Sequence, residues 1–122
     1  MNIDEEFDIF YVDLNKLEEQ IAEHSFLFVQ YSKELKKTQR ETQQKKADLD
    51  LVKAELSLKI IKNPKKYNLQ DKPTAPMVSS MVLKRSKYKA ALKAYFDAQE
   101  LTDSFQVYVN AFEHRKRMLE EA

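Results

Sequence analysis

The residues of this chain best suited to chemistry are lysines and tyrosines that gather in the middle of the sequence. Residues 59–93 hold ten lysine and arginine side chains and a single acid, Asp71. Lysine ammonium groups neutralise phosphates, and tyrosine rings offer flat faces on which any nucleobase can stack. This mixture is typical of surfaces that bind single-stranded nucleic acid without reading its sequence. The candidate contacts in this stretch are Lys59, Lys62, Lys65, Lys66, Tyr67, Lys72, Lys84, Arg85, Lys87 and Lys89. Tyr67 falls outside the apolar stripes on either side of it, so it is the better candidate for stacking on a base.

Catalytic chemistry has no comparable arrangement of residues. His24 falls within an apolar stripe and His114 within the charged stretch EHRKR, and neither has the spacing of a metal site. Adjacent acids such as Glu18 and Glu19 do not face one another on a helix, and the serines lack a nucleophile-elbow motif. The absence of cysteine excludes disulfides, thiol nucleophiles and cysteine-ligated zinc. We therefore expect a protein that is not an enzyme and has no metal or cofactor.

Two long amphipathic helices are predicted to position the basic stretch. Between residues 13 and 62, apolar side chains recur about every seven residues, with a more mixed set three residues later, as in a coiled coil. Asn63-Pro64 ends this helix because the residue before proline is disfavoured in helical geometry. Thr74 is the predicted cap of a second helix. The predicted fold is all-α, a long antiparallel hairpin of helices at about 13–62 and 74–121 within one domain, 13–122.

Charge is distributed unevenly along the predicted hairpin. The net charge is −7 for residues 1–28, +2 for 29–58, +9 for 59–93 and −3 for 94–122. Folding at the linker would place a basic tip, residues 59–93, at one end and both acidic segments at the other. Such an uneven distribution of charge indicates what kind of partner the protein binds. A second basic run, residues 33–46, either contacts nucleic acid or is neutralised by Asp97, Glu100 and Asp103 of the second helix.

The first twelve residues form an acidic segment in which carboxylates alternate with Phe7, Ile9, Phe10 and Tyr11. This segment is expected either to bind a protein partner as a tail or to cover the base of the hairpin. Its acidic start differs from a secretory signal, and no apolar run is long enough to span a membrane. We expect no membrane contact and a cytoplasmic location.

The stretch SFLFVQY, residues 25–31, is apolar around its whole helix, so a single neighbouring helix cannot cover it. The hairpin places it opposite FQVYVNAF, residues 105–112, which is equally apolar. An apolar belt of this kind marks an association surface, so a homo-oligomer is expected, with coverage by residues 7–12 as the alternative. The predicted oligomerisation residues are Phe26, Phe28, Val29, Tyr31, Phe105, Val109 and Phe112.

Two stretches, YSKELKKTQRE at 31–41 and LDLVKAEL at 49–56, resemble the corresponding part of the UvsY-like recombination mediators of phages. NPKKYNL, KPT and the closing NAFEHRKRMLE are similar to segments of the same family, so the resemblance covers most of residues 14–120. It implies a ring-forming helical homo-oligomer that binds single-stranded DNA, acts on strands coated by single-strand binding protein and helps load a RecA-like recombinase. The resemblance adds Lys53 to the candidate DNA contacts, because this residue falls in the segment that matches the family's DNA-contacting helix. Glu55 stands where a basic residue is expected, which favours the loop lysines as the main contacts.

The sequence thus predicts a non-enzymatic, single-stranded DNA-binding recombination mediator, located in the host cytoplasm if a phage encodes it. The alternative is a structural hairpin or scaffold whose basic tip binds an acidic protein. A regulator of double-stranded DNA is disfavoured because no short recognition helix is visible.

Overall fold

The computed structural model describes residues 17–121, and every regular element in that part of the chain is helical. The order is α2 (Leu17–Lys62), a short 3-10 helix η2 (Pro64–Tyr67), α3 (Ala75–Leu83) and α4 (Ser86–Glu121). The all-α prediction is confirmed. The prediction of one continuous helix over 74–121 is wrong, because α3 and α4 are separate helices. The predicted acidic segment at 1–12 lies outside the described residues.

These helices form two compact units. The terminal unit comprises Met1–Thr38 and Leu101–Ala122, of which the structure describes residues 17–38 and 101–121. The central unit is Gln39–Glu100. Because α2 and α4 each contribute residues to both units, each unit contains one stretch from either side of the connection at 63–74.

Aromatic side chains hold α2 and α4 together in the terminal unit. The ring of Tyr31 lies 5.2 Å from that of Phe112, 5.6 Å from that of Tyr108 and 6.1 Å from that of Phe105, measured between centroids. Residues 25–31 therefore lie opposite 105–112, and the predicted antiparallel pairing is confirmed for this unit. The buried members of this cluster, here called the terminal core, are Tyr31, Leu35, Val109 and Phe112.

Three polar side chains among the described residues of the terminal unit are buried, namely His24, Thr38 and Arg115. The His24 ring stacks on Phe28 and its Nε2 donates a hydrogen bond to the carbonyl oxygen of Phe112, which satisfies this nitrogen away from water. The predicted place of His24 within the apolar stripe is confirmed. Burial lowers the pKa of Arg115, and the nearby Glu23 carboxylate acts in the opposite direction.

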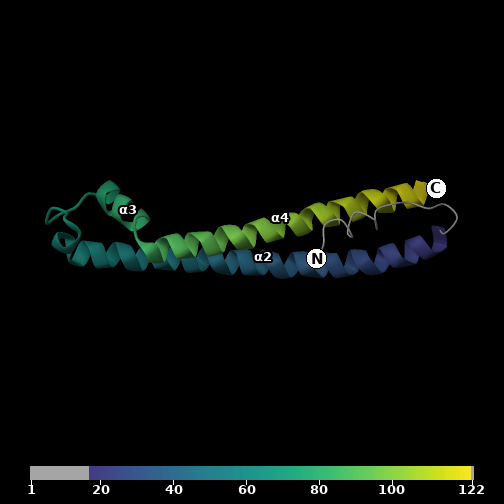
Figure 1. Ribbon diagram of the computed structural model, residues 1–122, viewed down its shortest axis with the longest axis horizontal. Coiled ribbons are helices and arrows are strands. Elements are labelled where there is room, and N and C mark those ends of the chain that lie inside the picture. The colour runs from purple at the N-terminus through teal and green to yellow at the C-terminus, as the bar shows by residue number, and fades with distance from the viewer. Residues whose placement is uncertain (1–16, 122) are drawn as a thin grey trace. The chain divides into compact units, whose positions relative to one another are not determined.

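The central unit has a separate apolar cluster, in which α3 packs against the carboxyl-terminal part of α2 (Figure 1). Ile60 and Val82 are almost completely buried, and burial of each such side chain contributes about 1.5–3 kcal/mol. This central core consists of Leu56, Ile60, Val78 and Val82, with Val52, Tyr67, Leu69, Met81 and Tyr88 packed around it.

The connection at 63–74 reverses the chain without any glycine. Asn68 adopts the left-handed conformation, at φ 59° and ψ 34°, which asparagine tolerates better than most residues. The backbone N–H of Leu69 donates to the carbonyl of Pro64 at 3.0 Å and closes the turn. Thr74 then caps α3, as predicted, because its hydroxyl accepts a hydrogen bond from the Met77 N–H at 3.4 Å.

The break between α3 and α4 lies at Lys84 and Arg85. Their backbone N–H groups donate to the carbonyls of Met81 and Val82 at 3.2 and 3.0 Å, so α3 ends in a tightened last turn. No proline or glycine marks this position. The break positions Arg85 beside η2, as described next.

Candidate nucleic-acid interface

All ten basic residues of the 59–93 stretch belong to the central unit. The unit contains fourteen lysine and arginine residues against seven acids, a net charge of +7. Lys59 and Lys62 lie in the last turn of α2, where the helix dipole favours positive side chains. η2 contributes Lys65 and Lys66, and the other lysines follow on the connection and at the junction of α3 and α4. Every predicted lysine is exposed, namely Lys53, Lys59, Lys62, Lys65, Lys66, Lys72, Lys84, Lys87 and Lys89.

Few of these charges are neutralised by neighbouring carboxylates. Lys65 Nζ lies 3.5 Å from Asp71, and Lys87 Nζ lies 3.7 Å from Glu55. Both pairs are exposed to solvent, where such bridges contribute at most about 1 kcal/mol. Within the described part of the chain, the other predicted lysines form no ion pair, and they are Lys53, Lys59, Lys62, Lys66, Lys72, Lys84 and Lys89.

Tyr67 and Arg85 contact one another instead of facing solvent freely. Tyr67 packs on the central core, and the Arg85 guanidinium lies over its ring at 4.6 Å from the centroid. Arg85 Nη2 also contacts the Met81 sulfur at 3.0 Å. The expectation that Tyr67 lies outside the apolar contacts is therefore wrong. A base could stack on the covered ring face only after Arg85 moves away.

Lys53 is separated from the loop lysines. It lies nine residues before Lys62 on α2, about 13 Å along the helix axis. Glu55, two residues further on, is the partner of Lys87 at the start of α4. Glu55 thus links α2 to α4 within the central unit.

The second basic run, 33–46, is also exposed at each of its lysines and at Arg40. Lys46 pairs with Asp50 at 3.4 Å and lies 5.6 Å from the centre of the Tyr95 ring. Asp97, a predicted neutralising partner of the run, is bound by Lys93 at 3.0 Å. The run therefore keeps most of its charge available.

The predicted oligomerisation residues divide into two sets. Tyr31, Val109 and Phe112 are buried in the terminal core of a single chain, so they expose little surface to a second copy. Phe28 and Phe105 are half-buried against the same core. Phe26 and Val29 remain 63% and 50% exposed, so they stay candidates for contact with a second copy.

A groove in the central unit was not anticipated from the sequence. It has a volume of about 580 Å³ and is formed by α2, the connection and the first turns of α3. One feature of the sequence could have indicated this groove, the pair Ile60-Ile61. Ile60 belongs to the buried apolar stripe of α2, so Ile61 must face away from the core. The lining residues are Ser57, Ile61, Asp71, Lys72, Pro73, Ala75, Val78 and Ser79.

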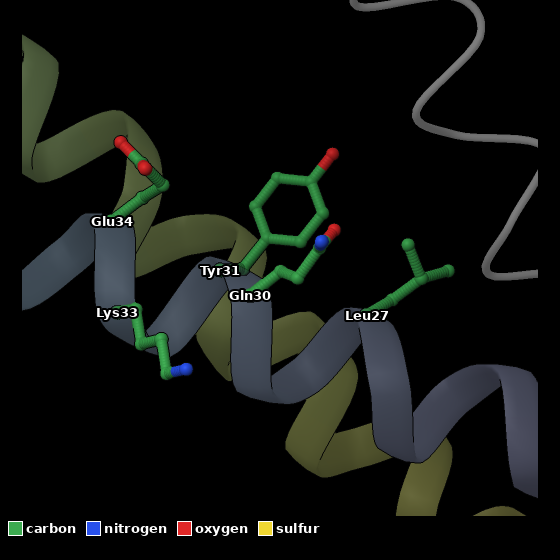
Figure 2. A pocket seen from close by; sticks show the side chains of 5 residues that line it. All are labelled: Leu27, Gln30, Tyr31, Lys33 and Glu34. Atoms are coloured by element: carbon green, nitrogen blue, oxygen red, sulfur yellow. The ribbon is translucent and has the colours of Figure 1, made fainter.

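A hollow of about 380 Å³ in the terminal unit is less suited to a ligand (Figure 2). Its lining residues, Leu27, Gln30, Tyr31, Lys33 and Glu34, all belong to α2. Figure 2 shows Leu27 and Tyr31 directed to one side of the helix and Lys33 to the other. Among residues 17–121, α2 is the one element that lines this hollow.

Between residues 17 and 121, no group of three or more histidine and acidic side chains gathers closely enough to hold a metal ion. None of the described helices is long and apolar enough to cross a membrane. Comparison with models of protein families, with curated proteins and with solved structures finds no match.

Proposed function

We propose that this chain is a non-enzymatic protein that binds single-stranded DNA and acts as a recombination mediator. In this role it helps a RecA-like recombinase to load on strands coated by single-strand binding protein. The DNA-binding part is carried by one observation, the concentration of exposed lysines without carboxylate partners in the central unit. The mediator part rests on the resemblance to UvsY-like proteins.

A single strand fits the central unit better than a duplex does. The lysines come from α2, η2, the connection and the start of α4, so they surround a turn and do not follow one short recognition helix. A flexible strand can follow such a surface, and its unpaired bases can reach apolar side chains between the charges. In a homo-oligomer, several such surfaces would hold one strand, which raises the apparent affinity.

Salt dependence of oligonucleotide binding tests the proposal. If about four to six phosphates are neutralised per protomer, the log–log slope of affinity against salt should be roughly −3 to −4. Changing Lys62, Lys65 and Lys66 together to alanine should weaken binding to all single-stranded sequences alike and flatten the slope by about 2. Fluorescence anisotropy with labelled single-stranded and duplex oligonucleotides measures both quantities.

A matched control removes three exposed lysines from the other basic run, by changing Lys33, Lys36 and Lys37 to alanine. Its slope should stay close to the wild-type value. If the control loses affinity and the first variant does not, the binding surface lies in 33–46. If the wild type binds no single strand but captures an acidic protein, the scaffold function replaces the proposal.

The mediator part of the proposal has its own test. The protein should speed the assembly of a RecA-like recombinase filament on strands coated by single-strand binding protein.

A further inference from the structure

The groove of the central unit combines apolar walls with a charged surrounding. Ile61 is half exposed on the α2 side, and Pro73, Ala75 and Val78 line the opposite side. Its volume of about 580 Å³ lies within the range of roughly 300–1,000 Å³ that small-ligand sites occupy. Apolar side chains around a space of this size can contact both faces of a planar ring.

The charges around the groove favour an anionic ligand. Lys72 is itself a lining residue, Lys62 follows the lining residue Ile61 in sequence, and Lys65 pairs with the lining residue Asp71. Asp71, the single acid of residues 59–93, also lines the groove, but its carboxylate lies 3.5 Å from the Lys65 ammonium. This pairing offsets the repulsion that a free carboxylate would exert on a phosphate.

The serine hydroxyls add polar groups at the rim. Ser57 donates its hydroxyl hydrogen to the Lys53 carbonyl at 2.8 Å, so its oxygen is left to accept from a ligand. Ser79 is exposed on α3 and lines the same groove. A planar ligand with N–H groups at its edge and a phosphate beside it matches these features.

We infer that this groove receives one unpaired nucleobase of a single strand, while the lysines around it hold the adjacent phosphates. The inference rests on the proposed single-strand binding and names the place of base contact within it. It differs from stacking on Tyr67, whose ring is covered by Arg85. The base enters between Ile61 on α2 and the first turns of α3. Contact with apolar side chains there compensates for the stacking on neighbouring bases that it gives up on leaving the strand.

A bulky side chain on α3 tests this inference. Ser79→Trp would fill the groove, whereas Ser80→Trp places the same group on the next exposed residue of α3, outside the lining set. Ser79→Trp should weaken binding of a labelled oligonucleotide by roughly ten-fold, as expected for one lost stack. Its salt slope should equal that of the wild type because no phosphate contact is removed. Ser80→Trp should bind as the wild type does.

An abasic oligonucleotide of the same length separates the base from its phosphate. The wild type should bind it roughly ten-fold more weakly than the normal strand, and Ser79→Trp should bind it as the wild type does. Equal binding of the normal strand by both tryptophan variants would overturn the inference. So would an equal loss for normal and abasic strands in Ser79→Trp, since the tryptophan would then obstruct phosphates.

Failure of the proposed function gives a different result. A wild type that binds neither strand removes both the function and the inference. If Ser79→Trp instead loses binding of a labelled acidic peptide, with oligonucleotide binding unchanged, the groove belongs to a protein partner. Circular dichroism of both tryptophan variants checks that α3 remains folded.

Discussion

The ring of Tyr67 and the guanidinium of Arg85 contact one another, and this changes the expected role of both residues. From sequence, Tyr67 is an aromatic residue outside the heptad pattern, which favours contact with a ligand. In the structure, Tyr67 packs on the central core and the guanidinium of Arg85 lies 4.6 Å from the centre of its ring. The residue type of Tyr67 therefore predicted an exposed aromatic ring. The sequence near Tyr67 gives no sign that Arg85, eighteen residues later, covers this ring.

Replacing Tyr67 should affect stability before it affects DNA binding. Tyr67→Ala removes a half-buried ring and its contact with Arg85, at an expected cost of about 1–2 kcal/mol in the free energy of unfolding. Tyr67→Phe keeps the ring and should change this free energy by less than about 0.5 kcal/mol. Urea unfolding followed by circular dichroism measures both variants. Unchanged stability with weaker oligonucleotide binding in Tyr67→Ala would instead restore the stacking role.

At the scale of the elements, the long helices, their connection and the pairing of 25–31 with 105–112 could be predicted from sequence. Apolar periodicity, Asn63-Pro64 and the Thr74 cap are local signals, and the structure follows them. The break at Lys84–Arg85 could not be predicted, because it depends on packing of Val78 and Val82 against α2. The groove was missed for the same reason, since its walls come from elements distant in sequence.

The lysines of the candidate site were predicted one by one from their type and clustering. Their exposure is as expected, but the distinction between paired and unpaired lysines required the structure. Lys65 and Lys87 have acidic partners, and Lys62 and Lys66 do not within the described residues. An ion pair between residues four apart in one helix can be predicted from the sequence. The Glu55–Lys87 pair cannot, because it joins two helices that are distant in sequence.

Two phenylalanines of α4 allow the packing of this helix to be tested. Phe112 is completely buried beside Tyr31 and His24, whereas Phe96 is 54% exposed. Phe112→Ala should lower the free energy of unfolding by about 3–5 kcal/mol through lost burial and the remaining cavity. Phe96→Ala should lower it by less than about 1 kcal/mol. Denaturation at one fixed protein concentration compares them, and equal losses would contradict the described core of the terminal unit.

At the scale of the whole molecule, charge is divided between the two units. By sequence, the terminal unit carries a net charge of −6 and the central unit +7. The terminal unit also exposes apolar side chains on α2, among them Ile21, Phe26 and Val29. Val29 and Ile21 line a groove of about 330 Å³ in this unit, together with Phe28 and Leu119. The central unit exposes large apolar side chains as well, among them Leu51, Leu58 and Phe96. We expect association between copies through the terminal unit, because its exposed apolar side chains lie beside an apolar groove and outside the concentration of lysines.

Charge placed on the exposed apolar residues should separate the copies. Phe26→Glu combined with Val29→Glu puts two carboxylates where the interface would exclude water, and burial of unpaired charges costs several kcal/mol. Both positions are exposed within the protomer, so its helicity should persist. As a control, Gln39→Glu with Gln43→Glu adds the same charge at exposed positions of α2 outside this apolar surface. Light scattering at micromolar concentration should give an oligomeric mass for the wild type and the control and a smaller mass for the first variant. A monomeric wild type would show that the exposed face of Phe26 and Val29 does not hold copies together.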